Sequence, residues 1–357
     1  MLLTLVQVLI ALVIVIVLFV IAFYIYNREY ITAIQTASQL RKRVDIFKGI
    51  KDLKYNKNEL YDTYDKTHPT YKDLQISVNQ KGGAEFTYNF WIYKDNTINL
   101  TRDTLPIKTD QGLRTDDIIL LLKGIKKTYS YRGLCGTPKN DVLVKCPLIK
   151  LQSDLDVMTV EINTVSSPDG VHEMSRNTCS DASKDWKKMN SHILAIEGLS
   201  KPNFDKKWFM VTVVMQDVTP VDPLPFRNRV RIMIYVNGVI ELDRYVDGRL
   251  SSVADDASII RQNMAPLYVA PTLKVDRSGT EVTIELPASI PEKSLYMADL
   301  SYHNYALPIE EIKALHKDGF TKTVAPSVAD TENTRNVINE MENSVSFTDG
   351  KQQLREF

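Results

Sequence analysis

The sequence predicts an all-β sandwich or jelly roll that follows an apolar N-terminal segment. Short runs of alternating apolar and polar residues recur along the middle of the chain, turn residues separate these runs, and one short helical pattern stands near residue 310. We expect four parts: a transmembrane helix at 1–27, a juxtamembrane helix and Tyr-rich linker at 28–81, a β domain at 82–320 and a polar tail at 321–357.

The first part contains an apolar run long enough to cross a bilayer. No charged side chain occurs from Val8 to Tyr26, and at about 1.5 Å per residue this helix would approach the thickness of a hydrocarbon core. Leu18 and Phe19 lie within the run, and Phe23 near its end is an aromatic residue suited to the headgroup region. A cleavable signal peptide has a shorter apolar region and a small-residue cleavage site, so we predict an uncleaved anchor.

Basic residues after this run predict its orientation. Arg41, Lys42 and Arg43 form a basic cluster, and basic residues outnumber acidic ones over 28–54. The large domain is therefore expected on the cytosolic side of a single-pass membrane protein. Apolar residues at three- and four-residue steps over 30–47 predict an amphipathic helix that carries the cluster, which either contacts anionic lipid or is only a solvated face.

The predicted strands begin where the pattern changes to a period of two. In FTYNFWIY, residues 86–93, alternate side chains form one apolar face and one mixed face, and Trp91 and Tyr93 belong to the mixed face. Further strands are expected within 117–124, 156–163, 207–217 and 229–246. Inside the last run, Asn237-Gly238 predicts a type I′ hairpin because both residue types tolerate a positive φ.

One short helix is expected at 308–317. Pro308 suits its first turn, where the missing N–H is not needed. Glu310 and Glu311 follow near the positive end of the helix dipole, and Gly319 can end the helix with a positive φ.

Composition argues against several functions. The chain has 44 residues of each charge, so no net field favours nucleic acid. The 5 histidines and 3 cysteines show no metal-ligand spacing, and we predict no metal and no cofactor. Cys135 and Cys146 bracket an expected hairpin and either pair or remain reduced.

Five segments in order resemble the concanavalin A-like, laminin-G-like jelly roll: FTYNFWIYKD, ILLLKG, KKWFMVTVVM, IYVNGVI and MADLSYHNYALPIEEIKALHKDG. Together with the apolar N-terminus and the segment NELYDTYDKTHPTYKDL, they resemble minor capsid proteins of large nucleocytoplasmic DNA viruses such as phycodnaviruses. The resemblance implies a non-enzymatic protein that links an internal viral membrane to the capsid. Its expected partners are the lipid bilayer and the major and minor capsid proteins, and its expected place in the virion is the internal membrane, facing the capsid.

A proline-containing insertion is the expected docking site for capsid partners. The laminin-G arrangement joins two of these strands tightly, but this chain inserts QDVTPVDPLPFRNR between them. Prolines reduce the entropy that a loop loses on binding. The expected contacts are Pro223, Leu224, Pro225, Phe226 and Arg227. The alternative is an insertion that binds nothing.

Carbohydrate chemistry gives the alternative functions, because lectins and glucanases share the resembled fold. Trp91, Tyr93 and Trp186 either stack on a sugar or pack within the protein. Retaining glucanases of this fold carry two carboxylates in the pattern E-x-D-x-x-E. The segment ELDRYV supplies Glu241 and Asp243, but a valine replaces the third acid. We therefore predict no catalytic residues, a lectin-like protein as the alternative, and a degenerate glycoside hydrolase as a distant third.

Overall fold

Two compact units make up the chain in the computed structural model, Met1–Lys42 and Arg43–Phe357. The described residues are 7, 12–21, 23, 40–53, 60–74, 77, 84–95, 117–129, 140–152, 155–165, 189–199, 201, 203–218, 229–246, 259–260, 265–275, 282–285 and 295–323.

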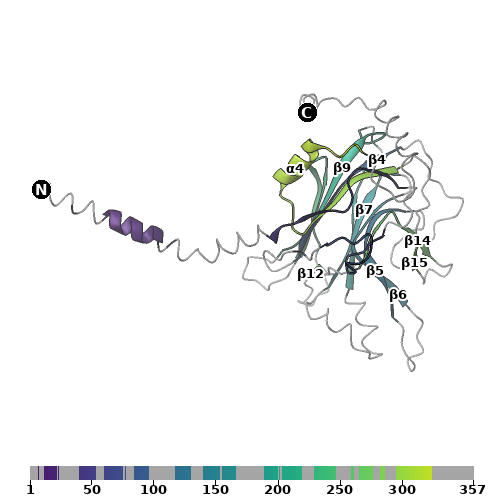
Figure 1. The fold of residues 1–357 in the computed structure, drawn as a ribbon, viewed down its shortest axis with the longest axis horizontal. Helices are drawn as coiled ribbons and strands as arrows, with labels where there is room; N and C mark the ends of the chain where they lie inside the picture. The colour runs from purple at the N-terminus through teal and green to yellow at the C-terminus, as the bar shows by residue number, and fades with distance from the viewer. Residues whose placement is uncertain are drawn as a thin grey trace, which may run out of the picture. The chain divides into compact units, whose positions relative to one another are not determined.

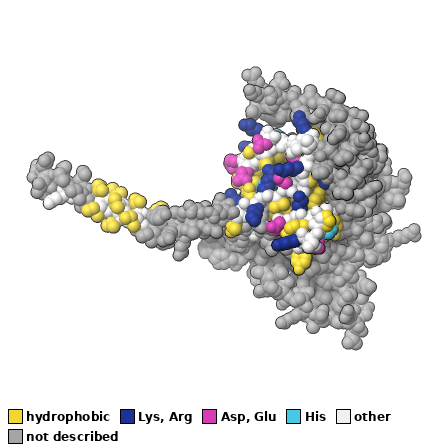
Figure 2. Space-filling view, viewed as in Figure 1, with side chains coloured by type: hydrophobic (Ala, Val, Ile, Leu, Met, Phe, Trp, Pro, Cys, Tyr) yellow, Lys and Arg dark blue, Asp and Glu magenta, His cyan; other side chains and the backbone are white. Residues whose placement is uncertain are grey.

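The first unit contains an apolar helical run at residues 12–21, drawn as the coiled ribbon near the N-terminus in Figure 1 and in yellow in Figure 2. Leu18, Phe19 and Phe23 are exposed, whereas Val8 and Tyr26 lie outside the described residues. Within the described part of the chain, no helix has the length and apolar character needed to cross a membrane.

This finding corrects two predictions. The first is the transmembrane helix at 1–27. The second is the location of the chain as a single-pass membrane protein with its large domain on the cytosolic side, and on the internal membrane in the virion.

Two antiparallel sheets of seven strands each form the second unit (Figure 1). The strand order of the first, called sheet A, is β1 (Arg43–Asp45), β16 (Leu295–His303), β4 (Glu85–Lys94), β9 (Trp208–Val218), β10 (Arg229–Val236) and β11 (Val239–Val246), and β2 (Ile50–Asp52) also pairs with β16. The order of sheet B is β12 (Ile259–Ile260), β7 (Met158–Val165), β6 (Asn140–Leu151), β5 (Ile118–Tyr129), β13 (Leu267–Val269) and β3 (Leu60–Tyr61), and β8 (Met189–Ile196) also pairs with β7. A separate hairpin joins β14 (Thr272–Val275) to β15 (Val282–Glu285). The predicted all-β sandwich is confirmed.

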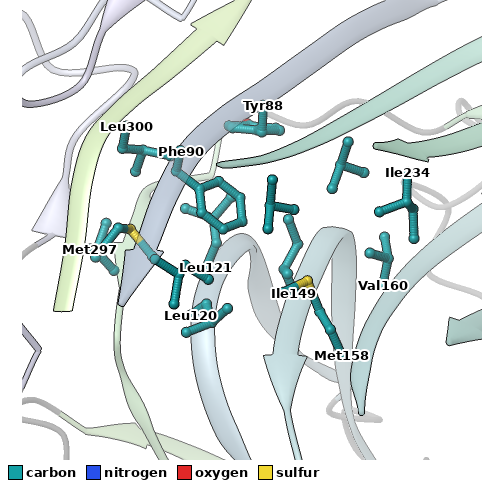
Figure 3. Packing of buried hydrophobic residues seen from close by; sticks show 14 of the residues in the cluster. Tyr88, Phe90, Leu120, Leu121, Ile149, Met158, Val160, Ile234, Met297 and Leu300 are labelled. Atoms are coloured by element: carbon teal, nitrogen blue, oxygen red, sulfur yellow. The ribbon is translucent and has the colours of Figure 1, made fainter. Parts of the chain in front are cut away.

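The main core lies between the sheets. Figure 3 shows Phe90 and Ile234 of sheet A in one layer with Leu120, Ile149 and Val160 of sheet B. All five side chains are fully buried. Removing such apolar surface from water is the largest stabilising contribution to a fold of this kind.

A second apolar layer covers the outer face of sheet A. Helix α4 (Ile309–Asp318) contributes Ile312 to a buried cluster that also contains Trp91 and residues of β9, β10 and β16. The predicted helix is confirmed: Pro308 precedes its first turn, and Gly319 ends it at φ 74°. The predicted hairpin between β10 and β11 is also confirmed by its two positive φ angles, 51° at Asn237 and 77° at Gly238.

The sandwich begins earlier than the predicted boundary at residue 82. Arg43–Asp45 forms β1 and pairs with β16, where Val44 lies opposite Tyr302. Ile46 and Phe47 follow as buried residues. The amphipathic helix predicted over 30–47 is therefore wrong for its last residues, because a few apolar residues fit either period and the distant partner strand decides between them.

The first residues of the predicted polar tail are also bound to sheet A. The N–H of Thr321 donates to Asp299 over 2.7 Å, and the carbonyl of Thr323 accepts the N–H of Ile50 over 2.8 Å. The folded unit thus extends at least to residue 323.

Candidate functional site

The exposed edge of sheet A is the candidate interaction site. This edge is strand β11, Val239–Val246, which pairs with β10 and with no other described strand; we call it the open edge. Three large apolar side chains of β11 are exposed: Val239 at 61%, Ile240 at 45% and Tyr245 at 50%. Figure 2 shows charged and apolar side chains mixed over the face that carries α4. An exposed apolar strand edge is a common site of protein association.

A bulge in the hairpin determines which way these side chains face. Pairing with β10 shifts between Ile234 and Tyr235, which leaves Glu241 without a directly opposite residue. Ile240 therefore shares a face with Tyr235, toward α4. Leu242 packs against the main core instead. Such a bulge re-aims side chains along an edge strand.

An ion pair fixes the centre of the open edge. Nε of Arg231 donates to Oδ1 of Asp243 over 2.8 Å, and Nη2 donates to Oδ2 over 2.5 Å. The guanidinium carbon also lies 5.6 Å from the centre of the Tyr245 ring. Hydrogen bonding by Arg231 lowers the pKa of Asp243, and hydrogen bonding by Asp243 raises that of Arg231. The pair is therefore ionised and nearly neutral as a unit.

This ion pair does not suit the glucanase chemistry weighed from Glu241 and Asp243. A retaining glucanase needs one carboxyl group that keeps its proton near neutral pH, which requires a raised pKa. Asp243 has a lowered pKa, and both of its oxygens accept from Arg231.

The aromatic residues considered for sugar stacking lie beneath α4. Trp91 is 7% exposed, with the ring of His316 stacked on it at 5.6 Å and that of Phe320 at 5.3 Å. Tyr93 is also buried and lies against Trp208 at 5.7 Å. Of the two alternatives left open for these rings, packing within the protein is the one observed, because α4 covers that face.

The other predicted site residues are not brought together in the described structure. Arg41 and Lys42 are exposed residues of the first unit. Arg43 belongs to β1, where its Nε lies 2.8 Å from Asp45. Two groups of predicted residues lie outside the described residues: Trp186, and the docking loop Pro223, Leu224, Pro225, Phe226 and Arg227.

Charged side chains that join the two sheets were missed by the sequence analysis. Nζ of Lys51 in β2 donates to the hydroxyl of Tyr61 in β3 over 2.9 Å. Nζ of Lys94 in β4 donates to the carbonyl of Leu155, just before β7, over 3.0 Å. Both lysines are buried. Hydrogen bonds from a buried charge hold two layers in one relative position, because a shift of the layers would leave the charge buried without a partner.

Asp217 in β9 makes a third link of this kind. Its Oδ2 accepts the N–H of Ala84 and its Oδ1 accepts the N–H of Ile260 in β12, each over 2.9 Å. Burial raises the pKa of Asp217 to about 6. The only sequence signal for these links is an isolated charge at the end of an apolar run, which is also common on solvated strands.

A buried chain of charges crosses sheet B. Glu161 in β7 contacts Lys145 and lies 2.9 Å from Lys150, both in β6, and Lys150 lies 2.5 Å from Asp117. Burial lowers the pKa of Lys145. Burial also acts most strongly on Lys150, but Glu161 and Asp117 together raise its pKa. Two positive and two negative groups thus neutralise one another within the protein.

A further lysine and a cysteine of sheet B are buried near one another. Burial lowers the pKa of Lys123 to about 8, and its Nζ lies 3.2 Å from the hydroxyl of Thr63. Cys146 is a free, buried thiol whose pKa burial raises to about 12, so it stays protonated. Cys135, its candidate disulfide partner, lies outside the described residues. Within the described ranges, no cluster of His, Cys, Asp or Glu could hold a metal ion.

No family model and no curated protein matches the chain. Among solved structures, the receptor-binding domain of botulinum neurotoxin D is similar at 11% identity and a TM-score of 0.33, over 69% of this chain and 39% of that one. The binding domain of serotype G is similar at 11% identity and a TM-score of 0.34, over 66% and 36%. The chain therefore spans well under half of these neighbours. The β-sandwich is established by its own strand pairing, and the likeness adds no inference about function.

Proposed function

We propose that the chain is a non-enzymatic structural protein, a minor capsid protein of a large DNA virus whose β-sandwich binds other capsid proteins. The viral assignment is supported by the sequence resemblance, and the structural role by the way the fold uses its charged residues.

The observation that carries this proposal is the set of buried charges that join strands and sheets. Lys51, Lys94 and Asp217 each form a hydrogen bond between sheet A and sheet B or the segment beside it. At the surface, the carboxylate of Asp243 likewise accepts a hydrogen bond from Arg231. Groups that could serve catalysis elsewhere hold layers together here, as expected in a building block that must keep its shape under load from neighbours.

The proposed contact with other capsid proteins is the loop with Leu224 and Phe226 at its centre. The loop joins the end of β9 at Val218 to the start of β10 at Arg229, two central strands of sheet A. A partner bound there would be connected directly to the best-packed part of the sandwich. The prolines around the two apolar residues lower the entropy lost on docking.

Carbohydrate binding is the alternative function from the sequence, and two of the three residues considered for it are buried. The rings of Trp91 and Tyr93 pack beneath α4, so neither presents a free face to a sugar.

The protein composition of purified virus particles tests the proposal. We expect the chain in the particles, cross-linked to a capsid protein. The double variant Leu224→Ser, Phe226→Ser should reduce its particle-associated amount roughly tenfold, as expected when central apolar contacts are removed. Ile193→Ser is the matched control, since Ile193 is an exposed apolar residue of β8 in the other sheet. Absence of the chain from purified particles would overturn the proposal.

A further inference from the structure

We propose that β11 pairs antiparallel with β11 of a second copy across a twofold axis, so that sheet A continues through the dimer. The partner is the chain itself, and the inference does not depend on the capsid assignment.

The first support is the length and exposure of β11. Three other strands at the ends of the two sheets are short, with three residues in β1 and two each in β3 and β12. The edge strand of sheet B, β8, also has eight residues, but it buries Leu194 and Ile196. Short edge strands are a common protection against pairing with another chain. The strand β11 has eight residues, each of them exposed or half-buried. The strand is therefore long enough, and exposed enough, for its outward N–H and C=O groups to form a ladder of hydrogen bonds with a second strand.

The second support is a register in which facing side chains match. A twofold axis perpendicular to the sheet requires that opposite residues lie on the same face. Tyr245 lies opposite Arg231 and Ile240 opposite Tyr235, so both belong to the α4 face, whereas Val239 and Val246 belong to the core face. With Glu241 as the extra residue of the bulge, a register centred on Asp243 satisfies this condition along the strand. The resulting pairs are Asp243–Asp243, Leu242–Arg244, Ile240–Tyr245 and Val239–Val246.

This register covers the exposed apolar side chains of the open edge. Ile240, 45% exposed, faces Tyr245, 50% exposed, and the pair forms twice because of the symmetry. Val239, 61% exposed, faces Val246 in the same way. Pairs between an aromatic and a β-branched residue are among the favourable cross-strand pairs.

The charges of the open edge are compatible with the same register. Two Asp243 side chains meet at the axis, but each is held by its own Arg231 at 2.8 and 2.5 Å, so the centre is an alternating group of two acids and two guanidinium ions. Arg244 of one copy comes beside Glu241 of the other, and both residues are exposed. The like charges at the axis are therefore each neutralised within their own copy, and the remaining charges brought together, those of Arg244 and Glu241, are opposite.

A cysteine cross-link tests the register directly. In the full chain with Cys135 and Cys179 replaced by serine, Asp243→Cys should form a disulfide-linked dimer on mild oxidation. Opposite residues of an antiparallel pair have Cα atoms about 4.5–5.5 Å apart, within disulfide range. Tyr245→Cys should not link, because two copies of residue 245 lie several residues apart in this register. Ile193→Cys, exposed on the edge strand of the other sheet, should not link either.

Sedimentation of the full chain tests the association itself. Ile240→Lys should raise the dissociation constant of the dimer roughly tenfold, because the Ile240–Tyr245 pair occurs twice in a symmetric dimer and the substitution removes both copies. Ile193→Lys makes the same change on β8 and should leave association unchanged. A monomeric unmodified chain, an assembly unaffected by Ile240→Lys, or equal cross-linking at 243, 245 and 193 would each overturn the proposal.

Discussion

The two edges of sheet A differ in how much of their side-chain surface is buried. At the first edge, β1 and β2 lie against β16, and the apolar residues between and after them are buried, with Ile46 at 1% exposure and Leu53 at 0%. At the second edge, β11 leaves Ile240 and Tyr245 half exposed. We call the first one the closed edge.

The difference lies in what each edge adds to the core. Residues of the closed edge reach over the end of the sheet, so that Ile46 and Leu53 join the main core. The backbone N–H of Ile46 donates to the carbonyl of Leu300 over 2.8 Å. The open edge contributes only partly buried Leu242 and Val246 to the same core. The closed edge therefore supports folding, and the open edge is available for association.

Truncating one isoleucine at each edge should give the largest contrast. Ile46→Ala removes a buried side chain and should lower the free energy of unfolding by about 2–5 kcal/mol. Ile240→Ala removes the same atoms from a half-exposed position and should change it by only about 0.5 kcal/mol. Urea denaturation of both variants measures the two values, at a protein concentration at which the chain is monomeric. Equal losses would remove the distinction between the edges.

Local patterns predicted the open edge better than the closed edge. Asn237-Gly238 carries its own turn preference, and the helix ending at Gly319 carries its own end signals, so both could be read from a few adjacent residues. β1 has no such signal: Val44 lies in a strand because Tyr302, far away in the sequence, lies opposite. Pairing over such distances leaves no trace in a short window.

A change of pH should affect the closed edge, because the buried histidine His303 lies beside its strand β1. The expected effect on stability is the second largest of the series. His303 is 3% exposed, stands opposite Arg43 of β1, and among the described residues has no hydrogen-bond partner for Nδ1. Burial, assisted by the charge of Arg43, lowers the pKa of His303 to about 4, while Asp45 acts in the opposite direction. The unfolded chain thus binds this proton more readily than the folded one.

Stability from His303 is complete above its unfolded pKa of 6.5 and is lost as pH falls toward 4. The loss should reach at most about 3 kcal/mol. Asp217 opposes it, because its raised pKa of about 6 makes the folded state bind a proton first and gain stability over nearly the same range. The difference in the free energy of unfolding between the unmodified chain and the variant His303→Gln, measured by urea denaturation at each pH, gives the contribution of the histidine alone. It should shrink on acidification, and a difference that is constant from pH 7 to 4 would contradict this account.

The candidate site was only partly predictable for a related reason. The sequence placed Trp91 and Tyr93 correctly on the mixed face of their strand, but whether that face is open depends on α4, which follows much later in the chain. The sequence likewise identified Asp243 as an acid on a strand. Its pairing with Arg231 depends on the bulge-shifted register of the hairpin, which composition does not reveal.

The ion pair of the open edge should give the smallest effect of the series. Arg231→Lys keeps the positive charge but loses the two-pronged contact with Asp243, and both residues are about one-third exposed, 32% and 33%. Solvent screens a pair in such a position, so the loss of unfolding free energy should be below about 1 kcal/mol and should decrease further in high salt. Denaturation at low and high salt, with Asp243→Asn and the double variant completing a cycle, measures the coupling of the two side chains. A coupling as large as the loss at Ile46 would mean that β11 is held as firmly as the closed edge, and the contrast between the two edges would then lie in exposure alone.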